Sequence, residues 1–529
     1  GLAYGLLANL TPISGVYTSI FSVLVYVVFG TVPHMSMGTN AVLSLITATM
    51  VEREADRYMR RNKMADSNAS YSHISAFAEG EERMNIKLGL AMTSTFLCGL
   101  ILLSMGFLRM GFLTNYMSTS FVNGFTSAAA LHIAISQMKH VFHIKIKAYS
   151  GLGKLVFTVI DVMNGLRNTN IADTIVCIVS ASELLSMNYF INPKLKELFG
   201  FMLPSNLFLV IAASVLSYIF NLHAAWNIAV VGKFDTSLPM PGLPLFDIEA
   251  VSGMLYDSLT QAVIIFTMSI SMAMLMAKLH SYELDSNREL VAYGACNLCS
   301  SFFTVQSSSV SPPRTMILSN SGARTTFNGV STVIAMIVSI RFVGWIFWPL
   351  PLATLAAMII VAVMDVFLQI KRAPVIWRIS RTDFVVWIST WLSTVFADLE
   401  YGIIIGILIS AFGFMFNNQN IKGELVVLST KEDLLLPGPG RASTRHLNKT
   451  RVFYFPSQLF FANAESFKRQ LYKQVFNPTS VNALSYTVNS DECSLSTEDL
   501  AIDTIILDCS AMTYIDIDGL NMLKNIVIQ

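Results

Sequence analysis

Apolar residues dominate positions 1–417 in stretches long enough to cross a membrane, with short polar segments between them. A spanning helix needs about 20 apolar residues, because it must cross the hydrocarbon layer with every backbone polar group bonded internally. A first series of seven segments covers residues 1–10, 14–32, 39–51, 86–108, 112–138, 171–190 and 201–221. A second series of seven covers residues 258–279, 287–304, 312–325, 328–346, 350–370, 382–398 and 400–417. The pattern predicts a mostly α-helical polytopic membrane protein with fourteen spans, and we expect the sequence to begin inside the first span.

The third segment of each series is short and begins at a helix-breaking sequence. These sequences are "MGTNAV" at 37–42 and "SPPRT" at 311–315. Paired short segments interrupted by Gly or Pro, at corresponding positions of two halves, indicate a transporter built from inverted repeats. An odd number of spans in each repeat would make the two halves point in opposite directions. We therefore predict two seven-span inverted repeats, each containing one half-helix.

Two loops give the orientation of the chain. One short loop carries four basic residues and is predicted to be cytoplasmic; these are Lys371, Arg372, Arg378 and Arg381. The polar segment 52–85 contains the sequon Asn68-Ala69-Ser70, a glycosylation site only if it is extracellular. Nine predicted spans separate the two loops, so they fall on opposite sides. The same count places residues 418–529 in the cytoplasm and Asn68 outside.

The composition changes after residue 417. The stretch "RVFYFPSQLFFANAESFKRQLYKQV" (451–475) is typical of a strand followed by an amphipathic helix. "DTIILDCSAMTYIDIDGLNMLKNIV" (503–527) is typical of a buried strand, a turn and a second helix. Alternating strands and helices favour a small α/β domain. We therefore divide the chain into a transmembrane domain, 1–417, and a cytoplasmic domain, 418–529.

The overall composition excludes several classes of function. The chain is 53% hydrophobic and only 13% charged, against about 25% charged in soluble domains. Its formal net charge of +1 offers no case for nucleic-acid binding. Cys296 and Cys299 form a CxxC without a second pair or a nearby His, so we expect no metal site and no cofactor. The sequence shows no HExxH, GxSxG or phosphate-binding loop, so we do not expect an enzyme.

Several long motifs resemble the sulfate permease (SulP) family of anion transporters, which includes pendrin- and prestin-like proteins. They are "GLAYGLLANLTPISGVYTSIFSVLVYVVFGTVPHMSMGTNAVLS", "GFLTNYMSTSFVNGFTSAAALHI", "LDSNRELVAYGACN" and "SVSPPRTMILSNSGAR". The C-terminal segment resembles the STAS domain of that family, which we expect to be incomplete at its C-terminal end. The resemblance implies a homodimer in which a core domain moves against a gate domain. It also implies an anion site between the facing N-termini of the third and tenth helices.

Carried over by position, the resemblance assigns nine residues to the anion site. They are Tyr4 from the first helix, Thr39, Asn40 and Ala41 from the third, and Ser311, Pro312, Pro313, Arg314 and Thr315 from the tenth. The family commonly has Pro-Phe at positions 39–40 and Ser at 313, so this chain departs from the pattern there. Facing helix N-termini leave backbone N–H groups unpaired and attract anions. Arg314 would add a permanent charge with a geometry suited to oxyanions.

Two interpretations of Glu289 stay open: a residue that couples transport to protons or charge, as in some members of the family, and a carboxylate favoured at a helix start. The leading functional hypothesis is a secondary active exchanger in the plasma membrane, with elevator-like alternating access, for anions such as sulfate, oxalate, chloride and bicarbonate. The alternatives are a prestin-like voltage-driven motor with little transport and an uncoupled anion channel. Beyond membrane lipids and small anions, we expect a second copy of the chain and regulatory proteins at the STAS domain as partners.

Overall fold

The structure is a computed structural model of the 529-residue chain. It describes residues 1–65, 76–116, 118–144, 146, 149, 151–199, 204–234, 236–419, 421–429, 435–437, 444–445, 450–476 and 504–528. The chain forms two compact units, Gly1–Ser410 and Ala411–Gln529. Helix α18 (Leu399–Gln419) runs through the division between them, and the expected boundary at 417/418 stays a prediction. Asn68 lies outside the described residues.

The first unit is built almost entirely from helices. In the first half of the sequence these are α1 (Leu2–Leu7), α2 (Pro12–Phe29), α3 (Ala41–Ala65), α4 (Ala76–Phe107), α5 (Thr119–Val141), α6 (Lys154–Gly165), α7 (Ile171–Ser186), α8 (Asn192–Phe199), α9 (Ser205–Ile219) and α10 (Leu222–Trp226). In the second half they are α11 (Ile248–His280), α12 (Ser286–Ser300), α13 (Pro312–Asn320), α14 (Asn328–Val338), α15 (Leu352–Phe367), α16 (Ala373–Ile379), α17 (Arg381–Ala397) and α18. Short 3-10 or π turns are η2 (Met110–Tyr116), η3 (Leu166–Asn168), η4 (Met187–Ile191), η5 (Ser339–Val343), η6 (Gly344–Phe347) and η7 (Leu368–Arg372).

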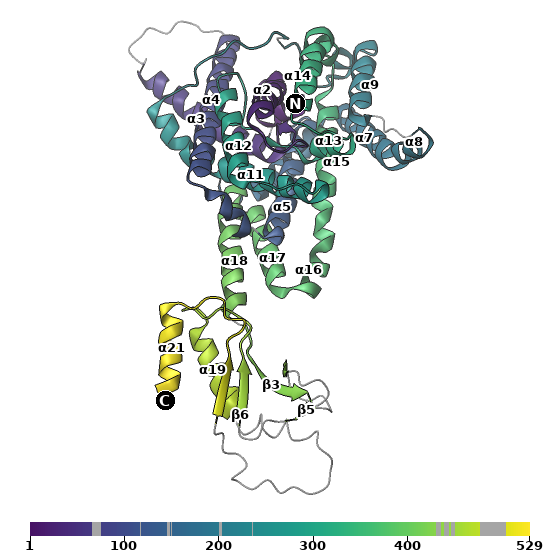
Figure 1. The fold of residues 1–529 in the computed structure, drawn as a ribbon. Helices are drawn as coiled ribbons and strands as arrows, with labels where there is room; N and C mark the ends of the chain where they lie inside the picture. The colour runs from purple at the N-terminus through teal and green to yellow at the C-terminus, as the bar shows by residue number, and fades with distance from the viewer. Residues whose placement is uncertain are drawn as a thin grey trace. The chain divides into compact units, whose positions relative to one another are not determined.

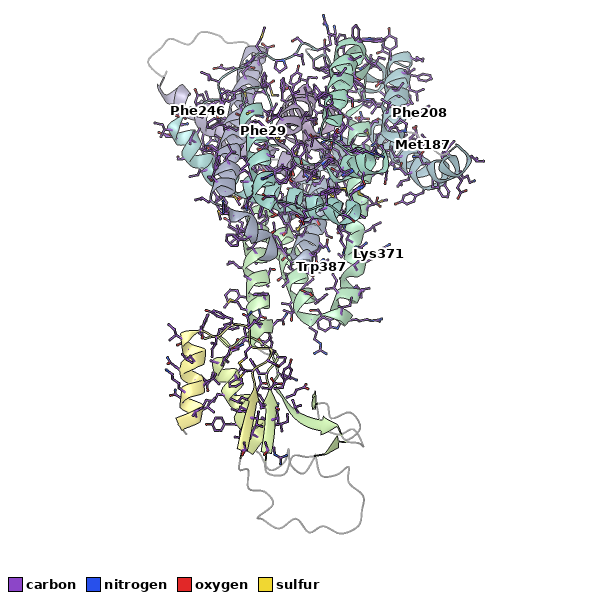
Figure 2. The ribbon with its side chains drawn as sticks, viewed as in Figure 1. Phe29, Met187, Phe208, Phe246, Lys371 and Trp387 are labelled. Carbon is purple, nitrogen blue, oxygen red and sulfur yellow. The ribbon has the colours of Figure 1, made fainter. Side chains whose placement is uncertain are left out.

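Membrane character is evident from the length and surface of these helices. Within the described ranges, seven helical stretches are long and apolar enough to cross a membrane. Large apolar side chains such as Phe29, Phe208 and Phe246 lie on the outside of the unit, each about half exposed, whereas Trp387 is 2% exposed in the interior (Figure 2). Apolar side chains on the outside are expected where lipid replaces water as the solvent. The predicted mostly helical polytopic membrane fold is confirmed.

The helices pack as two bundles, each drawn from both halves of the sequence. In the first bundle (α1–α4 and α11–α14), α12 packs against α4 and α2, α11 packs against α4, and α14 packs against α2. In the second bundle (α5–α9 and α15–α18), α5 packs against α15 and α17, and α7 packs against α15. Figure 1 shows α12 beside α4 and α2, although they are far apart in the sequence. This interleaving is typical of two repeats that exchange helices.

Two very short strands connect the halves inside the first bundle. Strand β1 (Met37–Gly38) pairs antiparallel with β2 (Ser309–Val310), in the register Met37↔Val310 and Gly38↔Ser309. Helix α3 begins three residues after β1, and α13 begins two residues after β2. Because the strands are antiparallel and each leads into a helix, the N-termini of α3 and α13 face each other across the pair. The two breaks predicted at residues 37–42 and 311–315 are confirmed as helix starts.

Two helical regions differ from the prediction. We expected a third segment over 39–51 and a polar loop over 52–85, but α3 continues to Ala65 and α4 already begins at Ala76. A hydropathy pattern marks where apolar character ends rather than where the helix ends. Ion pairs support the polar half of α3: Arg57 pairs with Glu54 one turn earlier on the same helix, and Arg53 pairs with Asp257 on α11. Helix α6 was missed, since its 12 residues are too few for a span.

The second unit combines a small sheet with two described helices. The sheet runs β4 (Leu435–Pro437), β3 (Glu424–Ser429), β6 (Thr450–Tyr454) and β7 (Thr504–Asp508), and β5 (Thr444–Arg445) also pairs with β3. Strands β6 and β7 are parallel, and the other pairs are antiparallel. Helices α19 (Ala464–Phe476) and α21 (Ile517–Ile528) complete the unit, and a core around Phe453, Phe455 and Phe467 lies between α19 and the sheet. The predicted α/β domain is confirmed.

Candidate anion-binding site

Arg314 lies in the first turn of α13, directly after the break in the helix. The turn begins with Pro312 at the first helical position, where the missing N–H costs no hydrogen bond. The guanidinium of Arg314 donates through Nη2 to the Met37 carbonyl at 3.1 Å and through Nη1 to Ser19 Oγ at 3.3 Å. These contacts tie α13 to β1 and to α2. They fix the guanidinium at the junction of three elements.

Within the described residues, no acidic side chain neutralises the charge of Arg314. No carboxylate forms a salt bridge with Arg314 among the residues that the structure describes. Both of its hydrogen-bond acceptors are neutral oxygens, and its Nε atom is buried without a partner in the same set of residues. A guanidinium has five N–H donors, so most of its hydrogen-bonding capacity remains for another group. Since a buried charge is costly unless it is paired, this arrangement favours a bound anion.

Gly38 allows the guanidinium to reach this place. Its φ angle is +150°, and a Cβ at this position would lie 2.3 Å from Arg314 Nη2 and 2.7 Å from Ser19 Oγ. A side chain at this position would therefore displace Arg314. Only glycine combines this backbone conformation with the space that the guanidinium occupies.

The residues predicted on α3 lie at its N-terminus, which faces α13, but the Asn40 side chain is bonded within its own helix. Thr39 and Asn40 are buried, and Ala41 is half-buried at the first position of α3. Asn40 Oδ1 accepts from the Val42 N–H at 2.9 Å, so this side chain caps its own helix. The backbone N–H of Ala41 has no partner within an α-helix by its position. The Asn40 amide nitrogen in turn donates to Met268 Sδ at 3.8 Å, so the donors that α3 offers are mainly backbone groups.

The expected residues around α13 are likewise partly engaged. The Ser311 N–H donates to the Ser36 carbonyl at 3.0 Å, and Thr315 Oγ1 accepts from the Ser36 N–H at 3.2 Å. Pro312 is exposed and has no N–H, and the backbone of Pro313 lies in α13. Tyr4 is half-buried on α1 and lies near enough to Arg314 to interact with its charge. The structure thus gathers the expected residues around the strand pair, with Arg314 as the unpaired charge.

Sequence reasoning missed the residues that hold the strands. Asn297 on α12 accepts from the Ser308 N–H at 2.8 Å and donates to the Ser308 carbonyl at 3.1 Å, so its amide acts like an added strand beside β2. Gln306 donates through Nε2 to Ser44 Oγ at 3.0 Å, and its N–H donates to Thr18 Oγ1 at 3.1 Å. The only sequence signal was the presence of amide side chains in apolar surroundings.

Glu289 is fully buried in the first turn of α12. Its carboxylate accepts from the Tyr26 hydroxyl at 2.9 Å, from the Thr31 N–H at 2.8 Å and from the Thr31 hydroxyl. No basic side chain pairs with it in the described part of the chain. Three neutral donors therefore hold this carboxylate. This geometry agrees with both interpretations of Glu289.

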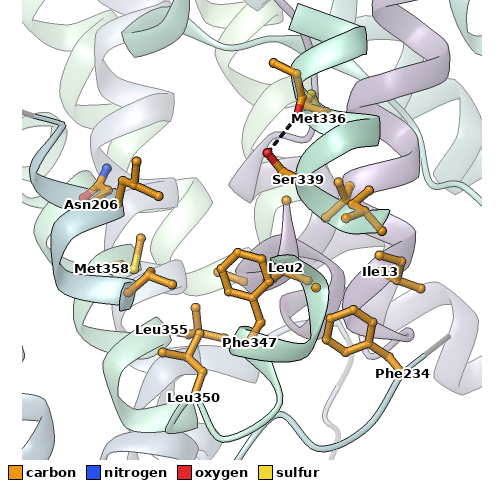
Figure 3. Close-up of a pocket in the computed structure, with 18 of the residues that line it drawn as sticks. Leu2, Ile13, Asn206, Phe234, Met336, Ser339, Phe347, Leu350, Leu355 and Met358 are labelled. Carbon is orange, nitrogen blue, oxygen red and sulfur yellow. Dashed lines mark hydrogen bonds between the residues drawn. The ribbon is translucent and has the colours of Figure 1, made fainter. Parts of the chain in front are cut away.

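A separate cavity of about 790 Å³ lies between helices of both bundles (Figure 3). Its walls are mainly apolar, with Leu2 and Ile13 on one side and Phe347, Leu355 and Met358 on the other. Arg314 is not among the residues that line it. No charged side chain is among its described lining residues.

Comparisons with known proteins agree with this geometry. The model of the sulfate permease family matches residues 1–390, and the STAS domain model matches residues 441–529. The chain is 29% identical to a sulfate transporter of Mus musculus and 28% identical to one of Homo sapiens, covering 99% of this chain and 74% of each relative. It is 29% identical to a prestin of Meriones unguiculatus, over 91% of this chain and 63% of that protein.

Solved structures show the same fold. The murine Solute Carrier 26 family member A9 anion transporter in the inward-facing state aligns with a TM-score of 0.81 and 25% identity, over 99% of this chain and 80% of that one. The transmembrane domain of a cyanobacterium bicarbonate transporter, BicA, aligns with a TM-score of 0.59 and 17% identity, over 78% of this chain and 92% of that one. The second likeness concerns the fold alone.

Proposed function

The chain belongs to the sulfate permease family of anion transporters, with a C-terminal STAS domain, and on that premise we propose that it is a secondary active anion exchanger. Its substrates would be anions such as sulfate, oxalate, chloride and bicarbonate. The single observation that carries the proposal is the half-buried Arg314 at a helix break, whose Nε is buried without a partner and whose guanidinium contacts only neutral acceptors among the described residues. A membrane protein tolerates such a charge where a transported anion pairs with it.

The anion would lie between the N-termini of α3 and α13. Backbone N–H groups at Ala41 and Arg314 are unpaired by their helix positions, and the two helix dipoles add positive potential at the same place. The Arg314 side chain would supply charged donors through Nε and its remaining N–H groups. Tyr4, Thr39 and Ser311 would complete the wall. Donors of several kinds would accept both spherical and oxyanion substrates.

Transport would follow alternating access. The first bundle, which contains the whole site, would be the core that moves against the second bundle as the gate. The basic loop at 371–381 would face the cytoplasm, as would the STAS domain, in a plasma-membrane homodimer with regulatory partners at that domain. Glu289, on α12 of the first bundle, would couple the transport cycle to protons or charge.

The match to a prestin makes a voltage-driven motor the second candidate, since it would use the same site. An uncoupled anion channel is the third alternative.

Uptake of labelled sulfate and chloride into proteoliposomes tests the proposal. Arg314→Gln removes the charge at the site, whereas Arg324→Gln removes an exposed charge ten residues further on. We expect saturable uptake that a counter-anion stimulates, with loss in Arg314→Gln and retention in Arg324→Gln. Absence of uptake combined with a voltage-dependent membrane capacitance would move the protein to the motor class. Large currents without counter-anion stimulation would indicate the channel.

A further inference from the structure

Two lysines of the second bundle reach across to the first bundle. Lys154, the first residue of α6, donates to Thr49 Oγ1 on α3 at 2.8 Å. Lys139, in the last turn of α5, donates to Asn9 Oδ1 in the turn between α1 and α2 at 3.1 Å. Both acceptors are neutral oxygens. These contacts therefore join the two bundles without forming an ion pair between them.

Lys154 is anchored firmly within its own bundle. Its Nζ lies 3.5 Å from Asp398 Oδ2, and both side chains are largely buried, with exposed fractions of 13% and 8%. The other carboxylate oxygen of Asp398 accepts from the Leu399 N–H at 2.8 Å. The Gly153 N–H donates to the Phe396 carbonyl at 2.9 Å and ties the start of α6 to the end of α17. The charge of Lys154 is thus balanced inside the second bundle.

These contacts lie at the end of the unit away from the basic loop. Helix α17 runs from Arg381, in the basic loop, to Ala397, next to Asp398, and its 17 residues span about 25 Å. In the orientation of the proposed function, this end is extracellular. The hydrogen bond from Lys154 to Thr49 therefore closes the junction between the bundles on the outer side.

We propose that Lys154 is the clasp of an outer gate: its hydrogen bond to Thr49 holds the bundles together on the extracellular side and breaks each time the site opens outward. The proposal rests on the proposed function. Opening costs only a hydrogen bond to a neutral hydroxyl, because the ion pair with Asp398 moves with Lys154. An ion pair across the junction would leave two unpaired charges on opening, and the gate would open rarely. Once open, the ammonium groups of Lys154 and Lys139 would face the entrance and attract anions.

The test measures opening without using transport. A reporter cysteine, Thr39→Cys, is placed in the site, and a membrane-impermeant thiol reagent is added from the outside. Thr49→Val removes the acceptor and keeps the side-chain shape. Thr158→Val is the matched control, because the Thr158 hydroxyl donates to the backbone carbonyl of Lys154 within α6, at 2.7 Å, and not to a described group of the first bundle. The same protein without the reporter gives the background from native cysteines.

We expect Thr49→Val to raise the rate of modification about 2- to 12-fold, the factor that corresponds to one ordinary hydrogen bond. Thr158→Val should leave the rate unchanged. A double variant, Lys154→Met with Asp398→Asn, removes the donor without leaving a buried carboxylate unpaired, and should raise the rate as well. Equal rates of modification in Thr49→Val, the double variant and Thr158→Val would overturn the proposal that the Lys154–Thr49 hydrogen bond holds the outer gate closed. The proposed function fails separately, if Arg314→Gln retains uptake.

Discussion

Gly38 offers the sharpest test of how the site holds Arg314, through the substitution Gly38→Ala. The new Cβ would lie 2.3 Å from Arg314 Nη2, about 1 Å inside an ordinary contact distance, so the guanidinium must move away from the Met37 carbonyl. Loss of one hydrogen bond to a charged group costs about 1.5–3 kcal/mol. If this loss falls on anion binding, the half-saturation concentration rises about 12- to 140-fold.

The assay is the concentration dependence of sulfate uptake, corrected for the amount of folded transporter in the membrane. The correction matters because a Cβ at φ +150° also strains the backbone by about 1–3 kcal/mol and lowers the folded fraction. Gly322→Ala is the matched control: Gly322 has φ +74°, and its added Cβ would meet nothing within 4 Å. It introduces strain without touching Arg314, so its half-saturation concentration should equal that of the wild type. Equal half-saturation concentrations in Gly38→Ala and Gly322→Ala would refute the reasoning.

Three further substitutions test other parts of the structure. Asn297→Ala leaves the N–H and the carbonyl of Ser308 unpaired, at about 1–3 kcal/mol each, and should lower the unfolding temperature of the purified transporter; an unchanged temperature would contradict the role of this amide. Glu289→Gln can keep an oxygen toward the two Thr31 donors and turn its NH2 toward the Tyr26 hydroxyl, so both interpretations expect a small change in stability, but only the coupling interpretation expects uptake to lose its dependence on pH. Phe467→Ala empties a fully buried position and should cost about 3–5 kcal/mol, seen as faster proteolysis of the second unit with the transmembrane unit intact.

The sequence predicted the features of the site that depend on local chemistry. Pro312 and Gly38 break regular structure by their own backbone properties, so the helix starts beside them were visible without a structure. Arg314 stood out because a charge at membrane depth must have a reason. The family motifs then placed both breaks in one site. Each of these signals lies within a few residues of the feature that it predicts.

The parts that could not be predicted depend on contacts between distant residues. Ser19 and Arg314 are 295 positions apart, and nothing in either segment shows that they meet. The amide of Asn297 is polar in an apolar helix, but its target, Ser308 directly before β2, follows only from the fold. The helical extension of α3 likewise depends on an ion pair between Arg53 and Asp257 on α11. Hydropathy marks the membrane-spanning parts of helices, whereas contacts between distant residues determine where the helices end and how the strand pair is held.

In the described part of the chain, the groups that bond Arg314 and the groups that hold the adjoining strand pair share one property, which is that they are neutral. Ser19, the Met37 carbonyl, Gln306 and Asn297 supply hydrogen bonds that fix backbone and guanidinium without adding a negative charge. A carboxylate in place of the Ser19 hydroxyl would pair with Arg314 permanently and would compete with the substrate. The clasp at Lys154 follows the same logic, since its partner across the junction is a hydroxyl. In both places neutral hydrogen-bond partners fix the position of a charged side chain. The charge of Arg314 stays available for an anion, and the charge of Lys154 stays paired within its own bundle. A transporter must bind and release its anion in each cycle, so the residues that position the charged side chains must not neutralise the charge that binds the anion.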